Sequence, residues 1–189
     1  KVAELVKSGM KLTCVSTSSS TTQLAQSLGI TLSSFNDVDK IDITIDGADE
    51  IDNNLNGIKG GGGALLFEKL IAKNSVKNIW VADSSKLVDQ LGKFPLPVEV
   101  VQFAAKNLYQ KFNEMNYNPE FRLKGKDYYL TDSSNMIIDL HLTKIENPSL
   151  LEKSLKEITG VVECGLFVGV ADTVLIGTDD GIRLIDRVL

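Results

Sequence analysis

Short apolar segments alternate with helical patterns along the first half of this chain, and that alternation constrains the fold more than any other feature. The predicted strands cover 11–16, 30–32, 41–45 and 78–82, and the predicted helices cover 1–9, 17–29, 64–74 and 85–91. Parallel strands need a crossover of about a dozen residues between them, which a helix commonly supplies. The alternation therefore predicts a mostly parallel sheet with helices on both faces.

The second half of the chain has a different pattern, which begins after Pro95 and Pro97. Two amphipathic helices are predicted at 101–115 and 149–160, and the strands between them lie in 120–142. This order of elements is typical of a small α+β sandwich of the ferredoxin-like type.

We therefore predict an α/β fold with a Rossmann-like, mostly parallel sheet domain plus a smaller α+β domain. A turn signal at Asp179-Asp180-Gly181 predicts a C-terminal hairpin that returns to the first domain. The Rossmann-like domain is expected to comprise 1–97 and 171–189, and the small domain 98–170. Because the chain opens without methionine, we expect the N-terminal part of the first domain to precede Lys1.

Charge and composition exclude several classes of function. A net charge of −5 and a pI near 5.0 argue against a nucleic-acid-binding face. No apolar run approaches the length of a membrane span, so no membrane partner is expected. His141 is the only histidine, which excludes zinc sites built on paired histidines. Cys14 and Cys164 lie far apart in apolar segments, as expected for reduced thiols of a cytoplasmic protein.

The predicted strand at 41–45 runs directly into the acidic sequence DGADE. Ligands of open parallel sheets bind outside the carboxyl ends of the strands. Asp46 and Asp49 could converge there on one small ligand, provided that Gly47 allows a tight turn. A calcium loop or a solvated acidic turn is the alternative, although the segment lacks the DxDxDG order of an EF-hand.

Four glycines, Gly60 to Gly63, stand between Lys59 and a predicted helix that begins at Ala64. Successive glycines before a helix let backbone N–H groups face an anion, assisted by the helix dipole. The pattern is neither a Walker A loop nor GxGxxG. A flexible linker is disfavoured because the glycines lead straight into an apolar helix.

Glu68 is expected to point into the protein. Its helical neighbours at three- and four-residue spacing are Ala64, Leu65, Ile71 and Ala72. All are apolar, whereas Lys69 and Lys73 are expected to mark the solvated side of the helix. Burial raises the pKa of a carboxyl group, which suits a general base. Pairing with a buried cation is the structural alternative.

Lys86 follows Asp83 just beyond the predicted strand at 78–82 and is expected within the first turn of a helix. A cation there opposes the helix dipole unless an anionic ligand shares the site. An exposed lysine without a role is the alternative. Taken together, the acidic loop, the glycine block, Glu68 and Lys86 all lie at or just beyond the carboxyl ends of strands.

These motifs identify a family. The segments IDGADEID, IKGGGGALLFEK and VADSSKLVDQLGKFPLPVEV closely resemble the type A ribose-5-phosphate isomerases, and the similarity extends through TDSSNMIIDLH, ITGVVECGLF and LIGTDDG. The resemblance implies interconversion of ribose 5-phosphate and ribulose 5-phosphate in the pentose phosphate pathway. It also implies a homodimer or larger homo-oligomer that uses neither a metal nor an organic cofactor.

The resemblance also assigns roles to residues. Glu68 matches the proton acceptor of the family, and Lys86 matches a substrate-binding lysine. The substrate-binding DGAD loop corresponds to Asp46, Gly47, Ala48 and Asp49, and the KGGG loop to Lys59, Gly60, Gly61 and Gly62. The family has a GTGST-like phosphate loop that we expect upstream of Lys1, and TSSSTT at 17–22 does not match it.

The residues and the resemblance agree on isomerisation through an enediolate. Glu68 is expected to move the proton from carbon 2 to carbon 1, while Lys59 and the glycine N–H groups stabilise the negative charge. Asp46 and Asp49 are expected to hold the sugar hydroxyls, with their individual roles left open. Two alternative functions are left open. One is a sugar-phosphate-sensing domain without turnover, and the other is a coenzyme A transferase-like enzyme with a nucleophilic glutamate.

Overall fold

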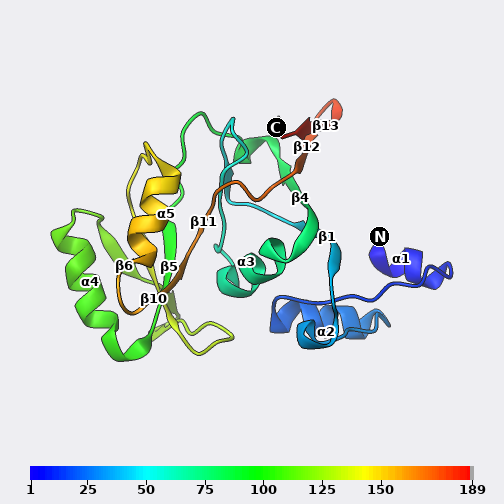
Figure 1. The fold of residues 1–189 in the computed structure, drawn as a ribbon, viewed down its shortest axis with the longest axis horizontal. Helices are drawn as coiled ribbons and strands as arrows, with labels where there is room; N and C mark the ends of the chain where they lie inside the picture. The colour runs from blue at the N-terminus through cyan, green and yellow to red at the C-terminus, as the bar shows by residue number, and fades with distance from the viewer. Residues whose placement is uncertain (188–189) are drawn as a thin grey trace.

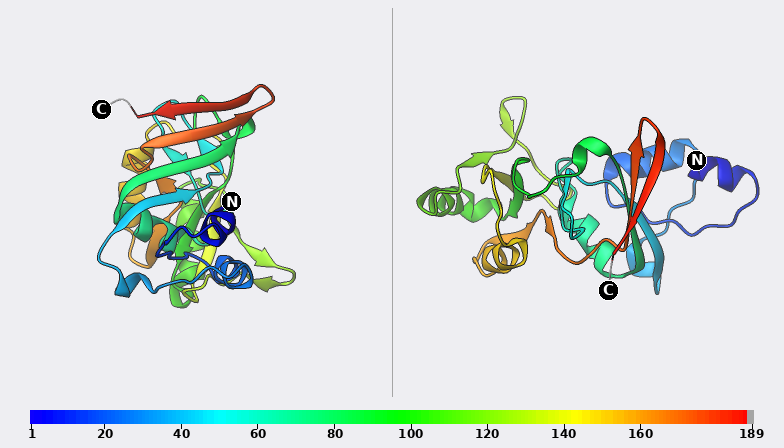
Figure 2. Two further views of the ribbon diagram at one scale, coloured as in Figure 1. Left: turned by 90° about the vertical axis from the view of Figure 1, so that its right-hand side faces the viewer. Right: turned by 90° about the horizontal axis from the view of Figure 1, so that it is seen from above.

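The computed structural model describes residues 1–187 and contains two larger sheets, with α3 (Leu65–Lys73) between them (Figure 1). The first sheet has the order β1-β4-β12-β13. Its strands are β1 (Ile41–Asp46), β4 (Ser75–Asp83), β12 (Thr173–Thr178) and β13 (Gly181–Asp186). The first three strands run parallel, and the hairpin partner β13 is antiparallel, as Figure 2 shows. The predicted parallel sheet and the returning C-terminal hairpin are therefore confirmed. The expectation of helices on both faces is wrong: within residues 1–187 one face stays open, with Ile43, Ile45 and Val81 exposed by 55%, 65% and 48%.

The second sheet is antiparallel throughout and has the order β10-β5-β9-β6. Its elements along the chain are β5 (Leu96–Val100), α4 (Ala105–Glu114), β6 (Pro119–Phe121), β9 (Met136–Leu140), α5 (Pro148–Lys156) and β10 (Val161–Cys164). A β-α-β-β-α-β order with the last strand beside the first is the ferredoxin-like arrangement. The predicted class of the second unit is thus confirmed.

Short strands connect the two larger sheets. The strands β2 (Glu50–Ile51), β3 (Gly57–Ile58) and β11 (Leu166–Phe167) form a three-stranded sheet in the order β11-β3-β2. A separate hairpin is made by β7 (Leu123–Lys124) and β8 (Asp127–Tyr128). Because β3 leads into the glycine block and β11 follows β10, this junction joins the first unit to the second.

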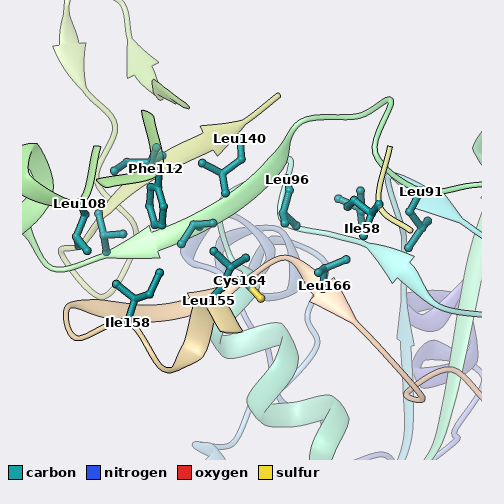
Figure 3. Packing of buried hydrophobic residues seen from close by; sticks show 14 of the residues in the cluster. Ile58, Leu91, Leu96, Leu108, Phe112, Leu140, Leu155, Ile158, Cys164 and Leu166 are labelled. Carbon is teal, nitrogen blue, oxygen red and sulfur yellow. The ribbon is translucent and has the colours of Figure 1, made fainter. Parts of the chain in front are cut away.

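Each unit has its own buried cluster. Around the second sheet, Leu108 and Phe112 of α4 and Leu155 of α5 pack with Leu96 and Leu140 (Figure 3). A second cluster beside the parallel sheet centres on Trp80 and Phe167, whose rings meet edge to face with centroids 6.4 Å apart. None of the helices within residues 1–187 has the length and apolar composition of a membrane-spanning segment.

The N-terminal segment contains α1 (Val2–Lys7), α2 (Ser19–Ser27) and the 3-10 turn η1 (Phe35–Asp37). The strands predicted at 11–16 and 30–32 are wrong as regular strands. They are reduced to one parallel bridge between Cys14 and Leu32. Most side chains of 11–16 stay partly or fully exposed, so this segment lacks the burial that a central strand would need.

The helix predicted at 85–91 is also wrong. A 3-10 turn, η2 (Ser84–Lys86), is followed by extended backbone, in which Leu87 forms a parallel bridge with Ile51. The Val88 N–H donates to the Ile51 carbonyl at 2.9 Å, so the backbone bonds that a helix needs are directed to β2 instead. A further 3-10 turn, η3 (Gln102–Ala104), precedes α4.

The predicted domain limits place a boundary between Pro97 and Val98, inside β5. These limits stay a prediction, and positions 188–189 of the first domain lie outside the described residues.

Candidate active site

A hairpin brings the acidic loop and the glycine block together. β1 ends at Asp46, and the chain then returns through the antiparallel pair β2–β3, in which Glu50 lies opposite Ile58. The Asp49 N–H donates to the Ile58 carbonyl at 2.8 Å, which places Lys59 beside the acidic loop. Two motifs separated in sequence therefore meet at the carboxyl end of β1, as expected for a site at the edge of a parallel sheet.

The Lys59 ammonium is the centre of this site. Its Nζ lies 2.8 Å from Asp46 Oδ2 and 3.1 Å from Glu68 Oε2, and it also donates to the Gly47 carbonyl. The Lys59 side chain is only 4% exposed, and its ammonium lies 5.3 Å from the centroid of the Phe167 ring. A buried lysine needs such partners because an isolated ammonium is costly to remove from water.

Glu68 points inward from α3, as predicted, and its side chain is 14% exposed. Its Oε2 atom is buried within ion-pair distance of Lys59 but is not aligned for a hydrogen bond. Burial raises the pKa of Glu68; Lys59 opposes this effect, while the charges of Asp46 and Asp49 add to it. The result is a carboxylate with a raised pKa beside a cation, an arrangement suited to proton transfer.

The two aspartates have different partners. Asp46 contacts Lys59 and also accepts from the Gly47 N–H at 2.8 Å. The Asp49 carboxylate instead accepts from the Gly61 N–H at 2.8 Å, which ties the acidic loop to the glycine block. Ala48, between them, is half-buried against the cluster around Trp80. Both carboxylates therefore face internal donors, which disfavours the solvated acidic turn left open by the sequence.

The glycine block is held by side chains that sequence reasoning missed. Arg122 Nη1 donates to the carbonyls of Gly60 and Gly61, at 2.7 and 3.0 Å. The Tyr129 hydroxyl donates to the Gly62 carbonyl at 3.2 Å. In the glycine block, the acceptors of Arg122 and Tyr129 are backbone carbonyls, so no residue pattern marks these contacts in the sequence; an arginine within a strand pattern is the only signal.

Lys86 lies apart from the Lys59 cluster. It ends the turn η2 just beyond β4, at the same edge of the sheet as Asp46 because β1 and β4 run parallel. Lys86 is half-buried and, among residues 1–187, makes no side-chain hydrogen bond or ion pair. The expected helical first turn is a 3-10 turn capped by Asp83, which accepts from the Ser85 N–H at 2.8 Å.

The segment TSSSTT, which matches no expected phosphate loop, lies against α3. A cavity of about 400 Å³ is lined by Ser16, Thr17, Ser18, Ser19, Thr22, Gln23, Phe67 and Asp132. Ser19 donates to Asp132 Oδ2 from both its N–H and its hydroxyl, at 2.8 and 2.9 Å. Phe67 precedes Glu68 on α3, so this hydroxyl-lined cavity adjoins the helix that carries the buried carboxylate.

The prediction that Lys69 lies on the solvated side of α3 is wrong. Lys73 is exposed as expected, but the Lys69 side chain is only 4% exposed. Its Nζ contacts Glu152 at 2.9 Å and Glu163 at 2.8 Å, and donates to the Cys164 carbonyl at 2.8 Å. The prediction failed because α3 packs against β1 and β4 and also against β10, so it has two buried sides.

Glu152, Glu163 and Cys164 are grouped closely enough to be considered as metal ligands. The Lys69 ammonium already contacts both carboxylates of this group and supplies its positive charge. Burial also raises the pKa of the Cys164 thiol to about 11, which disfavours the thiolate that a metal would need. A buried ion-pair network is the better interpretation of this cluster.

Replacing Lys69 with methionine is expected to lower the free energy of unfolding by roughly 3 kcal/mol, because two largely buried carboxylates lose their shared cation. Urea unfolding followed by circular dichroism measures the change. Lys73→Met on the exposed side of the same helix is the matched control and should stay within about 0.5 kcal/mol of the parent. An equally small effect of Lys69→Met would contradict the role assigned to this network.

Comparison with known proteins extends these observations. The family described as ribose 5-phosphate isomerase A (phosphoriboisomerase A) matches residues 13–181. A relative from Streptococcus thermophilus, named ribose-5-phosphate isomerase A, is 53% identical over 179 residues, which cover 94% of this chain and 79% of the relative. A relative of the same name from Levilactobacillus brevis is 50% identical over 182 residues, covering 95% and 80% of the two chains.

Solved structures agree with the sequence matches. A D-ribose-5-phosphate isomerase in complex with phospho-erythronic acid superposes with a TM-score of 0.95 at 39% identity, covering 98% of this chain and 83% of that one. Ribose 5-phosphate isomerase from Plasmodium falciparum superposes with a TM-score of 0.94 at 35% identity, covering 100% and 84%. The sequence matches and the shared fold together show that this chain belongs to the ribose 5-phosphate isomerase A family.

Proposed function

We propose that this chain interconverts ribose 5-phosphate and ribulose 5-phosphate through an enediolate, with Glu68 as the general base. The observation that carries the proposal is the buried Glu68 carboxylate, whose pKa is raised and which lies beside the Lys59 ammonium. Family membership supplies the substrate class and the reaction, including its place in the pentose phosphate pathway. The geometry supports the assignment of the base.

In the proposed mechanism, Glu68 removes the proton from carbon 2 of the open-chain aldose and returns it to carbon 1. A pKa raised above that of an ordinary glutamate brings the base closer to the operating pH, which favours proton transfer in both directions. Lys59 lies within reach of both Glu68 and Asp46, so its charge can stabilise the oxygen that becomes negative. No metal or organic cofactor takes part in this scheme.

Substrate binding is assigned to the loops around this base. Asp46 and Asp49 would hold the sugar hydroxyls, and Lys86 would contact the anionic or the hydroxyl end of the substrate from the same sheet edge. Asp46 is the nearer of the two aspartates to the proton-transfer pair, since both Asp46 and Glu68 contact Lys59. We also propose a cytoplasmic homo-oligomer, on the strength of the family resemblance alone.

Replacing Glu68 with glutamine should lower isomerase turnover by about two to four orders of magnitude, because the amide keeps the shape but cannot accept the proton. A coupled assay of ribulose 5-phosphate formation measures the change. Glu157→Gln, at an exposed glutamate next to α5, is the matched control and should retain parental turnover. Near-parental turnover of Glu68→Gln would contradict the assignment, and a parent chain that binds the sugar phosphate without turnover would favour the sensing domain.

The pH dependence of kcat/KM should report the same carboxylate. Only ionised Glu68 can accept a proton, so kcat/KM should rise with pH through a pKa above 4.5, the ordinary value for glutamate. The charge of Asp46 contributes to raising this pKa, so Asp46→Asn should move the acidic limb to lower pH even though it reduces the rate. Rate profiles between about pH 4 and 8 test both expectations. An acidic limb at or below 4.5 in the parent would be inconsistent with a raised pKa of Glu68.

A further inference from the structure

Arg122 holds the glycine block from the second unit of the fold, and the proposed mechanism does not use it. It stands between β6 and β7, and its side chain is 15% exposed. The guanidinium donates to Asp139 on β9 through both Nε, at 2.9 Å, and Nη2. A bidentate pair of this kind fixes the plane of the guanidinium. The remaining nitrogen, Nη1, is thereby directed at the carbonyls of Gly60 and Gly61.

Each carbonyl that Arg122 binds determines the direction of an N–H group. In a planar trans peptide the C=O and the next N–H point in opposite directions. Arg122 binds the Gly60 carbonyl, and the N–H of the same peptide, that of Gly61, reaches Asp49 at 2.8 Å on the other side. Arg122 also binds the Gly61 carbonyl, so the Gly62 N–H likewise points away from the guanidinium.

The Gly62 N–H differs from the N–H groups of its neighbours because it makes no hydrogen bond within the fold. The Gly61 N–H is taken by Asp49, and the Gly63 N–H donates to the Gly60 carbonyl at 3.0 Å. Within residues 1–187, the Gly62 N–H donates no hydrogen bond. A Cβ atom placed on Gly62 would meet nothing within 4 Å, so the space on that side of the residue is open.

We propose that Arg122 is a positioning residue that orients and polarises the Gly62 N–H. This N–H is the backbone donor to the negatively charged oxygen of the enediolate. This inference rests on the proposed function and narrows the anion-stabilising part of the glycine block to one N–H group. A cation on the carbonyl strengthens the N–H donor of the same peptide, and a donor fixed before the reaction needs no reorganisation. Asp139 holds Arg122, so the second unit of the fold completes the site.

The first test compares turnover with binding of an anionic analogue. Arg122→Gln should lower kcat by about 10- to 100-fold while KM changes much less, because the donor matters most once charge develops. Affinity for phospho-erythronic acid, whose carboxylate carries a charge near the reacting carbons, should fall in parallel with kcat/KM. Arg122→Lys keeps a cation but not the bidentate fork, and Asp139→Asn weakens that fork; both should give intermediate losses. Arg183→Gln, on exposed β13, should match the parent in every assay.

The second test follows the amide directly. In ¹⁵N-labelled protein, phospho-erythronic acid should shift the Gly62 N–H resonance downfield, and Arg122→Gln should reduce that shift at least twofold. Unchanged kcat and analogue affinity in a folded Arg122→Gln variant, or a loss confined to KM, would overturn the proposal. An unshifted Gly62 resonance in the parent would overturn it too. If the parent lacks turnover but its Gly62 amide still responds, the proposed function fails while the anion donor stands.

Discussion

The buried ammonium of Lys59 is the interaction on which the rest of the site depends. It contacts Asp46 at the end of β1 and Glu68 on α3, two residues far apart in the sequence. Its own backbone N–H donates to the Gly165 carbonyl at 2.8 Å, just before β11. An uncompensated charge at this depth would cost several kcal/mol, so the acidic loop, α3 and the central short sheet must come together around it.

The position of α3 explains how one helix carries both the proposed base and a buried ion-pair network. Glu68 and Lys69 are adjacent in the sequence and point to different buried environments on the two sides of the helix. The Phe167 ring adjoins both networks, with the ammonium groups of Lys59 and Lys69 at 5.3 and 4.9 Å from its centroid. The proposed base is therefore carried on a helix fixed on two sides, which limits its freedom to move away from the substrate.

Prediction from the sequence succeeded where local residue patterns decide the structure. The apolar neighbours of Glu68 sufficed to predict its inward direction, and strand–helix alternation predicted the parallel sheet. It failed where tertiary contacts decide: Lys69 is buried because a second unit covers that side of α3, and 85–91 stays extended because Leu87 and Val88 bond to β2. The contact of Arg122 with the glycine block could not be predicted, since the acceptors there are glycine carbonyls that no pattern of side chains marks.

The central claim is that a carboxylate moves a proton between neighbouring carbons. The most direct measurement is isomerisation of ribose 5-phosphate in D₂O, with deuterium at carbon 1 of the ribulose 5-phosphate quantified by NMR. Glu68 is 14% exposed, so a proton held on it can exchange with solvent before it returns. The account predicts substantial deuterium at carbon 1 in initial product. Complete transfer of the carbon 2 hydrogen to carbon 1, with no solvent label, would indicate a hydride shift and contradict the account.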